Sequence, residues 1–241
     1  MLYKTRGIVL HSIRYSDRFN IVHVLTENFG RTAYLVPKSG RKNAKTGNAC
    51  FHALSIVDME VEHLPLRDIH RIKEVKPNVA LANILFNPVK SAISLFLTEL
   101  VGKVVKDVQP NPPLFDYIYH SVCVLELLEK GIANFHLVFM FRLSRYLGFL
   151  PDTSGYSDGA YFDLQNGVFT QHKPQHPYFL NPDDSVAFNL LWRMNYENMH
   201  LFRLSHQERN EIVRRMLEYY RLHLADLPEL KSLDVLQQVF A

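Results

Sequence analysis

Apolar and polar residues alternate through roughly the first third of the chain. From Thr5 to about Val75 the alternation has a period of two, and turn residues such as Ser16-Asp17 and Asn28-Phe29-Gly30 separate the runs. This pattern predicts short antiparallel strands, because successive side chains of a strand point to opposite faces. Five strands within this length are typical of an OB-fold barrel, a fold that often binds single-stranded nucleic acid. We therefore expect an OB-fold domain at residues 1–77.

Beyond the expected barrel, the apolar spacing becomes helical. Asn87-Pro88 is a favourable helix start, because proline lacks an N–H that the first helical position would leave unpaired anyway. Further helices are expected from about Pro113 and over roughly Asn134 to Leu147. The predicted fold is therefore of the α+β class, with an α-helical domain at residues 78–241 behind the barrel.

An irregular stretch at about 152–182 interrupts the expected helical domain. It is rich in glycine, and its segment Ala160–Thr170 has the pattern of a small β-hairpin. Helices are expected to resume near Pro182. Ser205 and Glu208 have the spacing of a capping box, which predicts a helix start at that point.

Basic residues are concentrated at the N-terminus. The first fifty residues hold nine Lys or Arg and only Asp17 and Glu27 as acids, a net of +7, whereas the other 191 residues hold 18 basic and 22 acidic groups. A basic end on a near-neutral body is typical of a polyanion binder, because each Lys or Arg near a phosphate releases condensed counterions. A solvated basic surface without a partner is the alternative interpretation.

Two kinds of side chain usually hold a single strand: basic groups that follow the backbone, and aromatic rings on which bases stack. The candidates for phosphate contacts are Arg6, Arg14, Arg18, Arg31, Lys38, Arg41, Lys42 and Lys45. The candidates for base stacking are Tyr3, Tyr15 and Tyr34. A small barrel also needs aromatic core residues, so each tyrosine could instead lie inside it. The segment Lys38 to Asn48 is expected to form a basic hairpin.

Composition narrows the class of protein further. The two cysteines, Cys50 and Cys123, lie too far apart in sequence for a metal knuckle and favour a reduced setting. No stretch approaches 18 uninterrupted apolar residues, and the N-terminus shows no signal-peptide core. We expect a cytoplasmic, nucleoid-associated protein without a membrane span.

Motifs of several enzyme classes are missing from the sequence. It has no phosphate loop of the G-x-x-x-x-G-K-[ST] type, no G-x-G-x-x-G and no H-E-x-x-H. Asp58, Glu60 and Glu62 would lie on one face of an expected strand and could hold Mg²⁺ in a nuclease. A solvated outer strand face explains the three carboxylates as well, and we expect no enzymatic activity.

Short motifs in order along the whole chain resemble the family of the bacterial recombination mediator RecO. The N-terminal ones are Arg6-Gly7-Ile8-Val9-Leu10, Tyr15-Ser16-Asp17-Arg18, Val24-Leu25-Thr26 and Gly30-Arg31. Those similar to the family's central helix and the turn after it are Phe141-Arg142-Leu143, Arg145 and Leu147-Gly148-Phe149-Leu150-Pro151. Those similar to its C-terminal helix and tail are Tyr220, His223-Leu224 and Leu230-Lys231-Ser232.

The resemblance implies a mediator of DNA repair that binds single- and double-stranded DNA and anneals complementary strands. It would help to load RecA onto DNA coated by single-strand-binding protein, with RecR and the acidic C-terminal tail of that coating protein as partners. Arg142 and Arg145 match arginine positions of the family pattern and could hold the carboxylate of such a tail beside an apolar groove near Phe96, Leu97 and Leu100. They could equally be ordinary helix charges. A generic OB-fold RNA- or DNA-binding module and a scaffold for an acidic protein are the alternatives.

In one respect the sequence departs from the family pattern. Many members hold a structural zinc with two Cys-x-x-Cys pairs, and the first pair would fall near Tyr156 and Gly159, yet no cysteine follows Cys123. His172 and His176 have a tolerable ligand spacing but are expected to be loop residues. We therefore expect no metal and no other cofactor, with apolar packing of the hairpin in place of zinc.

Overall fold

The structure is a computed structural model. The residues that it describes are 1–38, 50–64, 66–106 and 109–239. They form two compact units, of which the first comprises residues 1–127 and 230–239 and the second comprises residues 128–229.

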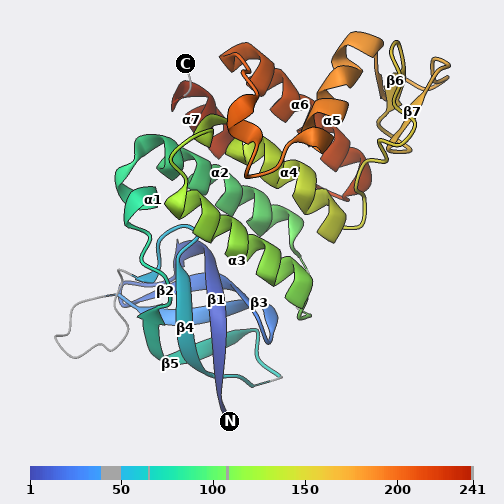
Figure 1. Cartoon of the computed structure of the whole chain (residues 1–241). Helices are drawn as coiled ribbons and strands as arrows, with labels where there is room; N and C mark the ends of the chain where they lie inside the picture. The colour runs from blue at the N-terminus through green and yellow to red at the C-terminus, as the bar shows by residue number, and fades with distance from the viewer. Residues whose placement is uncertain (39–49, 65, 107–108, 240–241) are drawn as a thin grey trace. The chain divides into compact units, whose positions relative to one another are not determined.

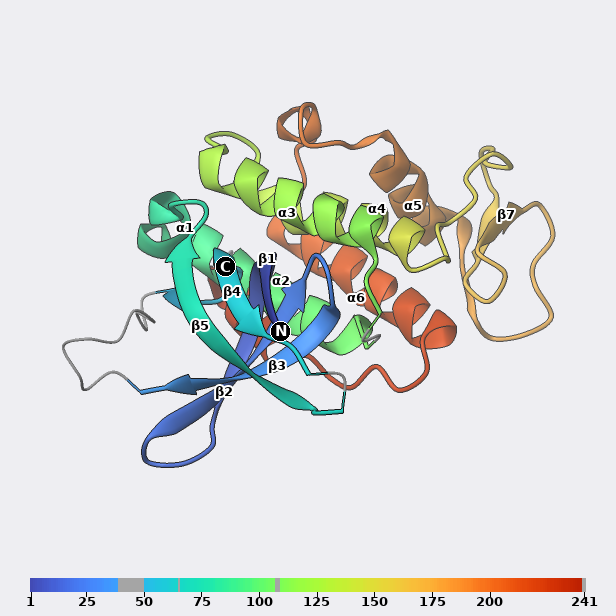
Figure 2. The same ribbon diagram turned by 90° about the horizontal axis from the view of Figure 1, so that it is seen from below.

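The first unit is built on a closed barrel. Its strands are β1 (Leu2–Arg14), β2 (Phe19–Thr26), β3 (Gly30–Pro37), β4 (Ile56–Glu62) and β5 (Ile69–Pro77). Their order around the barrel is β1-β2-β3-β5-β4, with β3 and β5 parallel and the other neighbours antiparallel (Figure 1). Figure 2 shows these strands curling around a common interior. The predicted OB-fold barrel is confirmed.

Alternate residues of the strands fill the barrel interior. Val22 and Val24 on β2, and Met59 on β4, are almost completely buried there. Gly7 on β1 faces the same space, and a Cβ added to it would lie 2.5 Å from Val24 Cγ1 and 2.6 Å from Met59 Cε. Only glycine fits at this close approach, so packing inside the barrel explains the glycine that follows Arg6 in the sequence.

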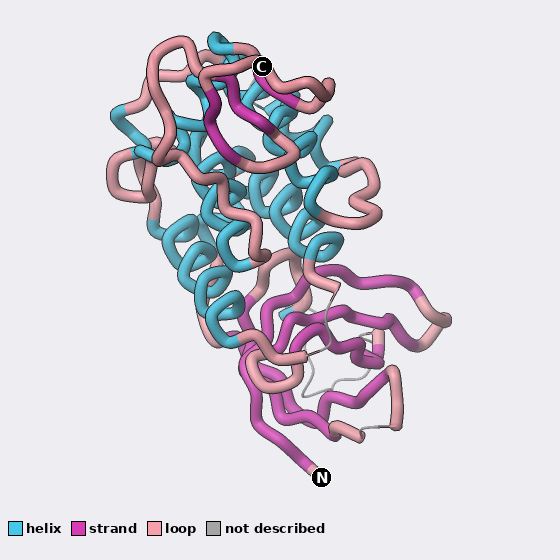
Figure 3. Tube along the Cα trace, turned by 90° about the vertical axis from the view of Figure 1, so that its right-hand side faces the viewer, coloured by secondary structure: helices cyan, strands magenta, loops and turns pink. Residues whose placement is uncertain are grey.

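Helices complete the first unit. They are α1 (Ala82–Phe86), α2 (Pro88–Val104), α3 (Pro112–Leu127) and α7 (Ser232–Val239), drawn in cyan in Figure 3. The predicted start of α2 is confirmed, with the Asn87 side chain accepting hydrogen bonds from the first-turn N–H groups and Pro88 at the first position. α2 contacts both β1 and α7. The Glu99 carboxylate on α2 accepts hydrogen bonds from the Lys231 and Ser232 N–H groups at the start of α7.

The second unit combines helices with a small sheet. Its helices are α4 (Phe135–Tyr146), α5 (Pro182–Arg193) and α6 (His206–His223), and its strands are β6 (Tyr161–Asp163), β7 (Val168–Thr170) and β8 (Phe179–Leu180). The sheet order is β7-β6-β8, and β6 and β7 form the predicted hairpin. The predicted capping box of Ser205 and Glu208 begins α6. Gly167, in the hairpin turn, has φ +70° and leaves room for the Tyr219 hydroxyl.

The α+β class of the fold is confirmed by this arrangement. The division into a barrel domain at 1–77 and a helical domain at 78–241 stays a prediction. In the structure α1, α2, α3 and α7 belong to the same compact unit as the barrel. Among the described residues, no helix combines the length and the hydropathy needed to cross a bilayer.

Candidate nucleic-acid interface

Three of the predicted DNA-binding cations come together at the turn between β1 and β2. Arg14 ends β1, Arg18 lies in the turn, and Lys38 directly follows β3. The Lys38 N–H donates to the Arg18 carbonyl at 2.8 Å, and the Lys38 ammonium donates to the Ser16 carbonyl at 2.6 Å. We call Arg14, Tyr15, Arg18 and Lys38 the cationic tip.

Arg14, Tyr15 and Arg18 of the cationic tip are exposed, whereas Lys38 is half-buried. Arg14 is 73% exposed and contacts Asp17, itself 93% exposed, at 2.7 Å. An exposed ion pair of this kind contributes little free energy, so Arg14 can exchange it for a phosphate. Tyr15, between the cations, is 63% exposed and presents a ring to the solvent. Cations with an exposed aromatic ring among them are what a single-strand binding surface requires.

Arg6 lies away from the tip and is engaged within the first unit. Its guanidinium donates two hydrogen bonds to the Glu27 carboxylate, at 2.9 and 2.7 Å, and its Cζ lies 4.9 Å from the centre of the Tyr119 ring. The hydrogen bond to Glu27 raises the pKa of Arg6 and lowers that of Glu27. This bidentate pair commits the charge of Arg6 to the fold.

Arg31 is also engaged, at the C-terminal end of α2. Its Nη1 donates to the carbonyls of Gly102, at 2.8 Å, and Val105, at 3.0 Å. The last carbonyls of a helix lack partners within the helix, and a cation stabilises that end of its dipole. Burial lowers the pKa of Arg31. The structure thus gives Arg31 a role in joining the barrel to α2.

The remaining predicted cations, Arg41, Lys42 and Lys45, lie outside the described residues, as does most of the expected Lys38–Asn48 hairpin. Their contact with phosphate stays a prediction from sequence.

The three candidate stacking tyrosines differ in burial. Tyr15 is exposed, and Tyr3 is 38% exposed with its ring edge-on to Phe29 at 5.4 Å between centroids. Tyr34 is fully buried in the barrel core, where burial also raises its pKa. It offers no ring face to a base, so Tyr34 must be removed from the stacking candidates.

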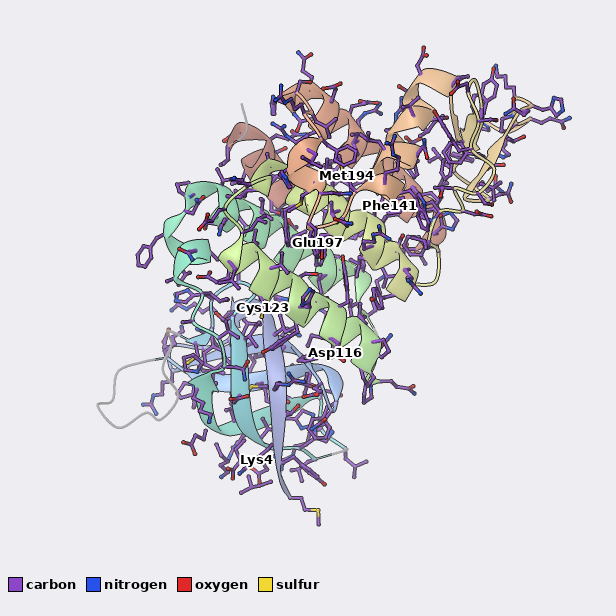
Figure 4. The ribbon with its side chains drawn as sticks, viewed as in Figure 1. Lys4, Asp116, Cys123, Phe141, Met194 and Glu197 are labelled. Carbon is purple, nitrogen blue, oxygen red and sulfur yellow. The ribbon has the colours of Figure 1, made fainter. Side chains whose placement is uncertain are left out.

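A second set of barrel cations lies on the outer face of β1, β4 and β5, where a cavity of about 450 Å³ opens. We call it the balanced face, and its residues are Lys4, Arg6, Asp58, Glu60, Glu74 and Lys76, with Lys4 labelled in Figure 4.

The carboxylates of the balanced face lie between cations. In the strand register Lys4 is opposite Glu60, and Asp58 is flanked by Arg6 and Lys76. Asp58 also accepts a hydrogen bond from Asn78 Nδ2 at 3.0 Å. Within the part of the chain that the structure describes, no group of three or more His, Cys, Asp or Glu side chains is placed to hold a metal ion. The geometry therefore agrees with the solvated-face interpretation of Asp58, Glu60 and Glu62.

The predicted peptide-binding arginines lie on α4 in the second unit. Arg142 donates to the carbonyls of Trp192, at 3.2 Å, and Met194, at 3.1 Å, and its Cζ lies 5.6 Å from the centre of the Trp192 ring. The Met194 side chain and that of Phe141, both labelled in Figure 4, are completely buried. Arg145, one helical turn further along, is exposed.

The apolar groove expected near Phe96, Leu97 and Leu100 is a wrong prediction. These side chains on α2 are at most 1% exposed, so they offer no open apolar surface. An amphipathic stripe identifies the inward face of a helix and cannot by itself indicate an open groove. Near Arg142 the exposed apolar side chain is instead Trp192, which is 45% exposed.

The hairpin of the second unit does not fit a zinc site. Tyr156 and Gly159 supply no thiolate at the expected ligand positions. Asp163 instead organises the turn: its Oδ1 accepts from the Gln165 and Asn166 N–H groups, each at 2.9 Å, and its Oδ2 lies 3.2 Å from His176 Nε2. These bonds hold the turn that follows β6.

Aromatic packing supports the same hairpin. The Phe162 ring packs on Phe169 and Phe188, with centroids 4.9 and 4.3 Å apart. These ring contacts hold the hairpin against α5.

One motif escaped the sequence analysis. Residues Gly155 to Gly159 read G-x-S-x-G, the pattern of a hydrolase nucleophile elbow. Here the segment lies in turns ahead of β6, whereas the elbow needs a strand that leads directly into a helix. The Ser157 hydroxyl is hydrogen-bonded to the Gln171 side chain. The match lacks the structural context of a nucleophile.

A column of aromatic rings also escaped it, because the histidines are scattered singly in sequence. The rings of Phe29, His63 and His70 stack in that order, with centroids 4.1 and 4.2 Å apart and interplanar angles of 13° and 20°. His63 follows β4 and His70 lies in β5, so the loop between these strands brings them together. The signal available in the sequence was the position of both histidines beside the β4–β5 loop, which binds ligands in many OB folds.

Comparison with known proteins supports the resemblance throughout the chain. Residues 1–78 match a family model described as "Recombination protein O N terminal", and residues 85–234 match one described as "Recombination protein O C terminal". The DNA repair protein RecO of Azobacteroides pseudotrichonymphae genomovar. CFP2 is 48% identical over 240 residues, which cover all of both chains. The proteins of the same name from Phocaeicola vulgatus and Bacteroides fragilis are 43% and 44% identical, again over the full length of each. The chain therefore belongs to the RecO family.

Proposed function

We propose that this protein is a recombination mediator of DNA repair that binds single-stranded DNA through the cationic tip of its barrel. The observation that carries the proposal is the tip itself, where the exposed arginines Arg14 and Arg18 and an exposed tyrosine, Tyr15, lie at one turn of an OB fold. Membership of the RecO family supports the role in repair.

The chemistry of the tip suits the annealing of complementary strands. Cations that neutralise phosphates release counterions and reduce the repulsion that a second strand meets. Contacts to phosphate carry no sequence information, so the base edges stay available for pairing. The same contacts would hold double-stranded DNA. In the proposed role the protein also helps to load RecA onto strands coated by single-strand-binding protein, and acts together with RecR.

The tail of the coating protein is proposed to bind α4 beside Trp192. An acidic tail that ends in an apolar residue could place that side chain on the exposed Trp192 ring. Arg145 is exposed on α4, three residues after Arg142. It would hold the terminal carboxylate, because arginine pairs a carboxylate through two parallel hydrogen bonds. Arg142 would contribute less, since its guanidinium is already bound to two carbonyls.

A strand-annealing assay without ATP or metal tests the proposed function. Two complementary, labelled oligonucleotides are mixed with the whole protein, and duplex formation is followed by fluorescence. We expect annealing that is faster than the spontaneous reaction and weakens with salt. Binding to single-stranded DNA or RNA without any annealing would instead favour a generic OB-fold module, and no binding at all would favour a protein scaffold.

The basic segment after Lys38 is tested in the same assay. Replacing Arg41, Lys42 and Lys45 by Ala should weaken binding and make log Kd depend less steeply on log salt. The slope should fall by about 0.7 for each phosphate of the single strand that the variant no longer neutralises. An unchanged slope would exclude this segment from the interface.

A further inference from the structure

A second candidate site lies beside the aromatic column, on a different part of the barrel from the cationic tip. A cavity of about 610 Å³ is lined by residues of β2 and β3, the β4–β5 loop and the segment after α2. Phe29, His63 and His70 all belong to its wall. The cavity is therefore bordered by an ordered stack of rings and is large enough for a small ligand.

The charge around this cavity is positive. Arg31, Arg67 and Lys106 line it, and Asp68 is the carboxylate among the lining residues. Arg67 is exposed, and within the described residues its guanidinium has no ion-pair partner. The balanced face shows the opposite arrangement, because its cations lie opposite carboxylates in the strand register. Of these two cavities, only the one beside the column offers an anion an excess of cations.

Hydrogen-bonding groups complete the lining. The amides of Asn28 and Gln109 are part of the wall. His63 Nδ1 is buried and, among the described residues, has no hydrogen-bond partner. Burial lowers the pKa of both His63 and His70, and the His70 Nδ1 already accepts a hydrogen bond from the Leu64 N–H at 3.3 Å. A buried polar atom without a partner is costly, and a ligand that supplies one would be favoured.

We propose that this cavity binds one nucleotide of a DNA single strand. The base would lie against the edges of the Phe29–His63–His70 column, with its polar edge toward the amides and His63, and its phosphate would lie between Arg67 and Lys106. A nucleotide is the ligand class that combines a flat aromatic ring, a polar edge and an adjacent anion. The inference rests on the proposed binding of single-stranded DNA and adds to it a site that senses the base itself.

The test compares two strands with equal phosphates and different bases. A labelled oligothymidylate of about fifteen nucleotides and a strand of the same length made of abasic residues are titrated with the whole protein by fluorescence anisotropy. We expect the wild type to prefer the base-containing strand by roughly tenfold, because the abasic strand has no base to contact the column, the amides or His63. His63→Ala should remove most of that preference and leave affinity for the abasic strand unchanged. Arg67→Ala should weaken the binding of both strands by the same factor.

Arg71→Ala is the matched control, because Arg71 is an exposed arginine of β5 outside the lining of the cavity. It should leave both affinities near those of the wild type.

A second measurement does not depend on the folding of any variant. A single 5-iododeoxyuridine in the oligomer is photo-crosslinked to the wild type and the modified peptide is identified by mass spectrometry. Cross-links to Phe29 or His63 support the site. The inference is overturned if cross-links form only elsewhere, or if the wild type binds both strands equally. Salt-dependent binding and annealing would persist in that case, so the proposed function would stand; loss of all DNA binding would overturn both.

Discussion

The cationic tip and the balanced face each include cations of β1, Arg14 at the tip and Lys4 and Arg6 on the balanced face, yet the structure uses them differently. On the balanced face Arg6 is bound to Glu27, and Lys76 lies 3.9 Å from Asp58. At the tip the one carboxylate that pairs with an arginine, that of Asp17, is itself almost fully exposed. The first arrangement satisfies its charges within the barrel, whereas the second leaves the exposed Arg14 and Arg18 side chains for a partner.

The difference shows that a local excess of charge does not by itself locate a binding surface. The balanced face forms because β1, rich in cations, pairs directly with the acidic strand β4. A polyanion approaching it would have to displace ion pairs that already exist and would meet carboxylates of its own sign. The tip lies at the end of β1, where Arg14 is paired with the neutral Asn20 of β2. Strand pairing therefore decides which cations of the sequence remain available.

The largest expected effect comes from removing the tip. Replacing Arg14, Arg18 and Lys38 by Ala should weaken single-strand binding roughly a hundredfold near 0.1 M salt, and should reduce the slope of log K against log salt by about 2, if each contacts one phosphate. Anisotropy titrations at several salt concentrations measure both quantities.

The balanced face supplies the control for this experiment. Lys4 and Lys76 of the balanced face are exposed, as is Lys73 on β5 outside it, and replacing these three lysines by Ala removes the same number of positive charges. We expect the affinity to fall by much less than for the tip variant. Equal losses in the two triple variants would mean that overall charge, and no particular surface, governs binding.

The sequence predicted some features of this structure and not others. The alternation of apolar residues was enough to predict the barrel. Local signals were enough to predict the start of α2 and the capping box of α6, because a helix start depends on residues that are neighbours in sequence. Tyr34 was misassigned because alternation identifies a strand but does not say which of its faces is inward. That choice depends on pairing with β2 and β5.

The engaged arginines could not be identified for a related reason. Arg6 finds its partner 21 residues away, and Arg31 binds carbonyls more than 70 residues away. Every residue has a backbone carbonyl whatever its type, so no sequence pattern could have indicated which carbonyls Arg31 binds. The stacked column of Phe29, His63 and His70 depends on three separate segments in the same way.

The second unit offers the same contrast between an engaged and an exposed arginine. Arg145→Ala should weaken binding of a labelled peptide copy of the coating protein's tail by about thirtyfold, equivalent to about 2 kcal/mol for a charge-assisted bidentate contact. Arg142→Ala should lower the melting temperature and affect the peptide less, because its guanidinium holds two carbonyls. Single-strand binding, measured on the same samples, should be unaffected. If neither change weakens the peptide, the tail binds elsewhere.

A smaller effect is expected from breaking the pair of Arg6 and Glu27. Arg6→Ala should cost about 1 kcal/mol of stability, since the pair is partly exposed, and should change DNA affinity less than twofold. Arg6 holds the pKa of Glu27 below its ordinary value of 4.5, so the pair stabilises the fold above that pH and loses its effect as the pH falls through the lower, folded-state value.

The melting temperatures of wild type and Arg6→Ala should therefore differ at pH 7 and converge as the pH falls below the lowered pKa of Glu27. A difference that persists in acid would show that Arg6 acts through packing against the Tyr119 ring instead. A large loss of DNA affinity would show that Arg6 contacts DNA as the tip residues do, and that its pairing with Glu27 does not exclude it from binding.

The smallest expected effect is that of a metal chelator, which should change nothing. In the hairpin, Asp163 is an acceptor for the Gln165 and Asn166 N–H groups, so the turn is closed by hydrogen bonds that need no metal. A structural zinc site would contribute directly to folding, and its removal would lower the melting temperature. The melting temperature and the affinity of the tip for single strands should both be the same with and without EDTA.

Asp163→Ala, by contrast, should lower the melting temperature while leaving DNA affinity intact, because it removes the acceptor that closes the hairpin. Elemental analysis that finds one zinc per chain, together with a melting temperature that drops in EDTA, would show that histidines and carboxylates have replaced the missing thiolates.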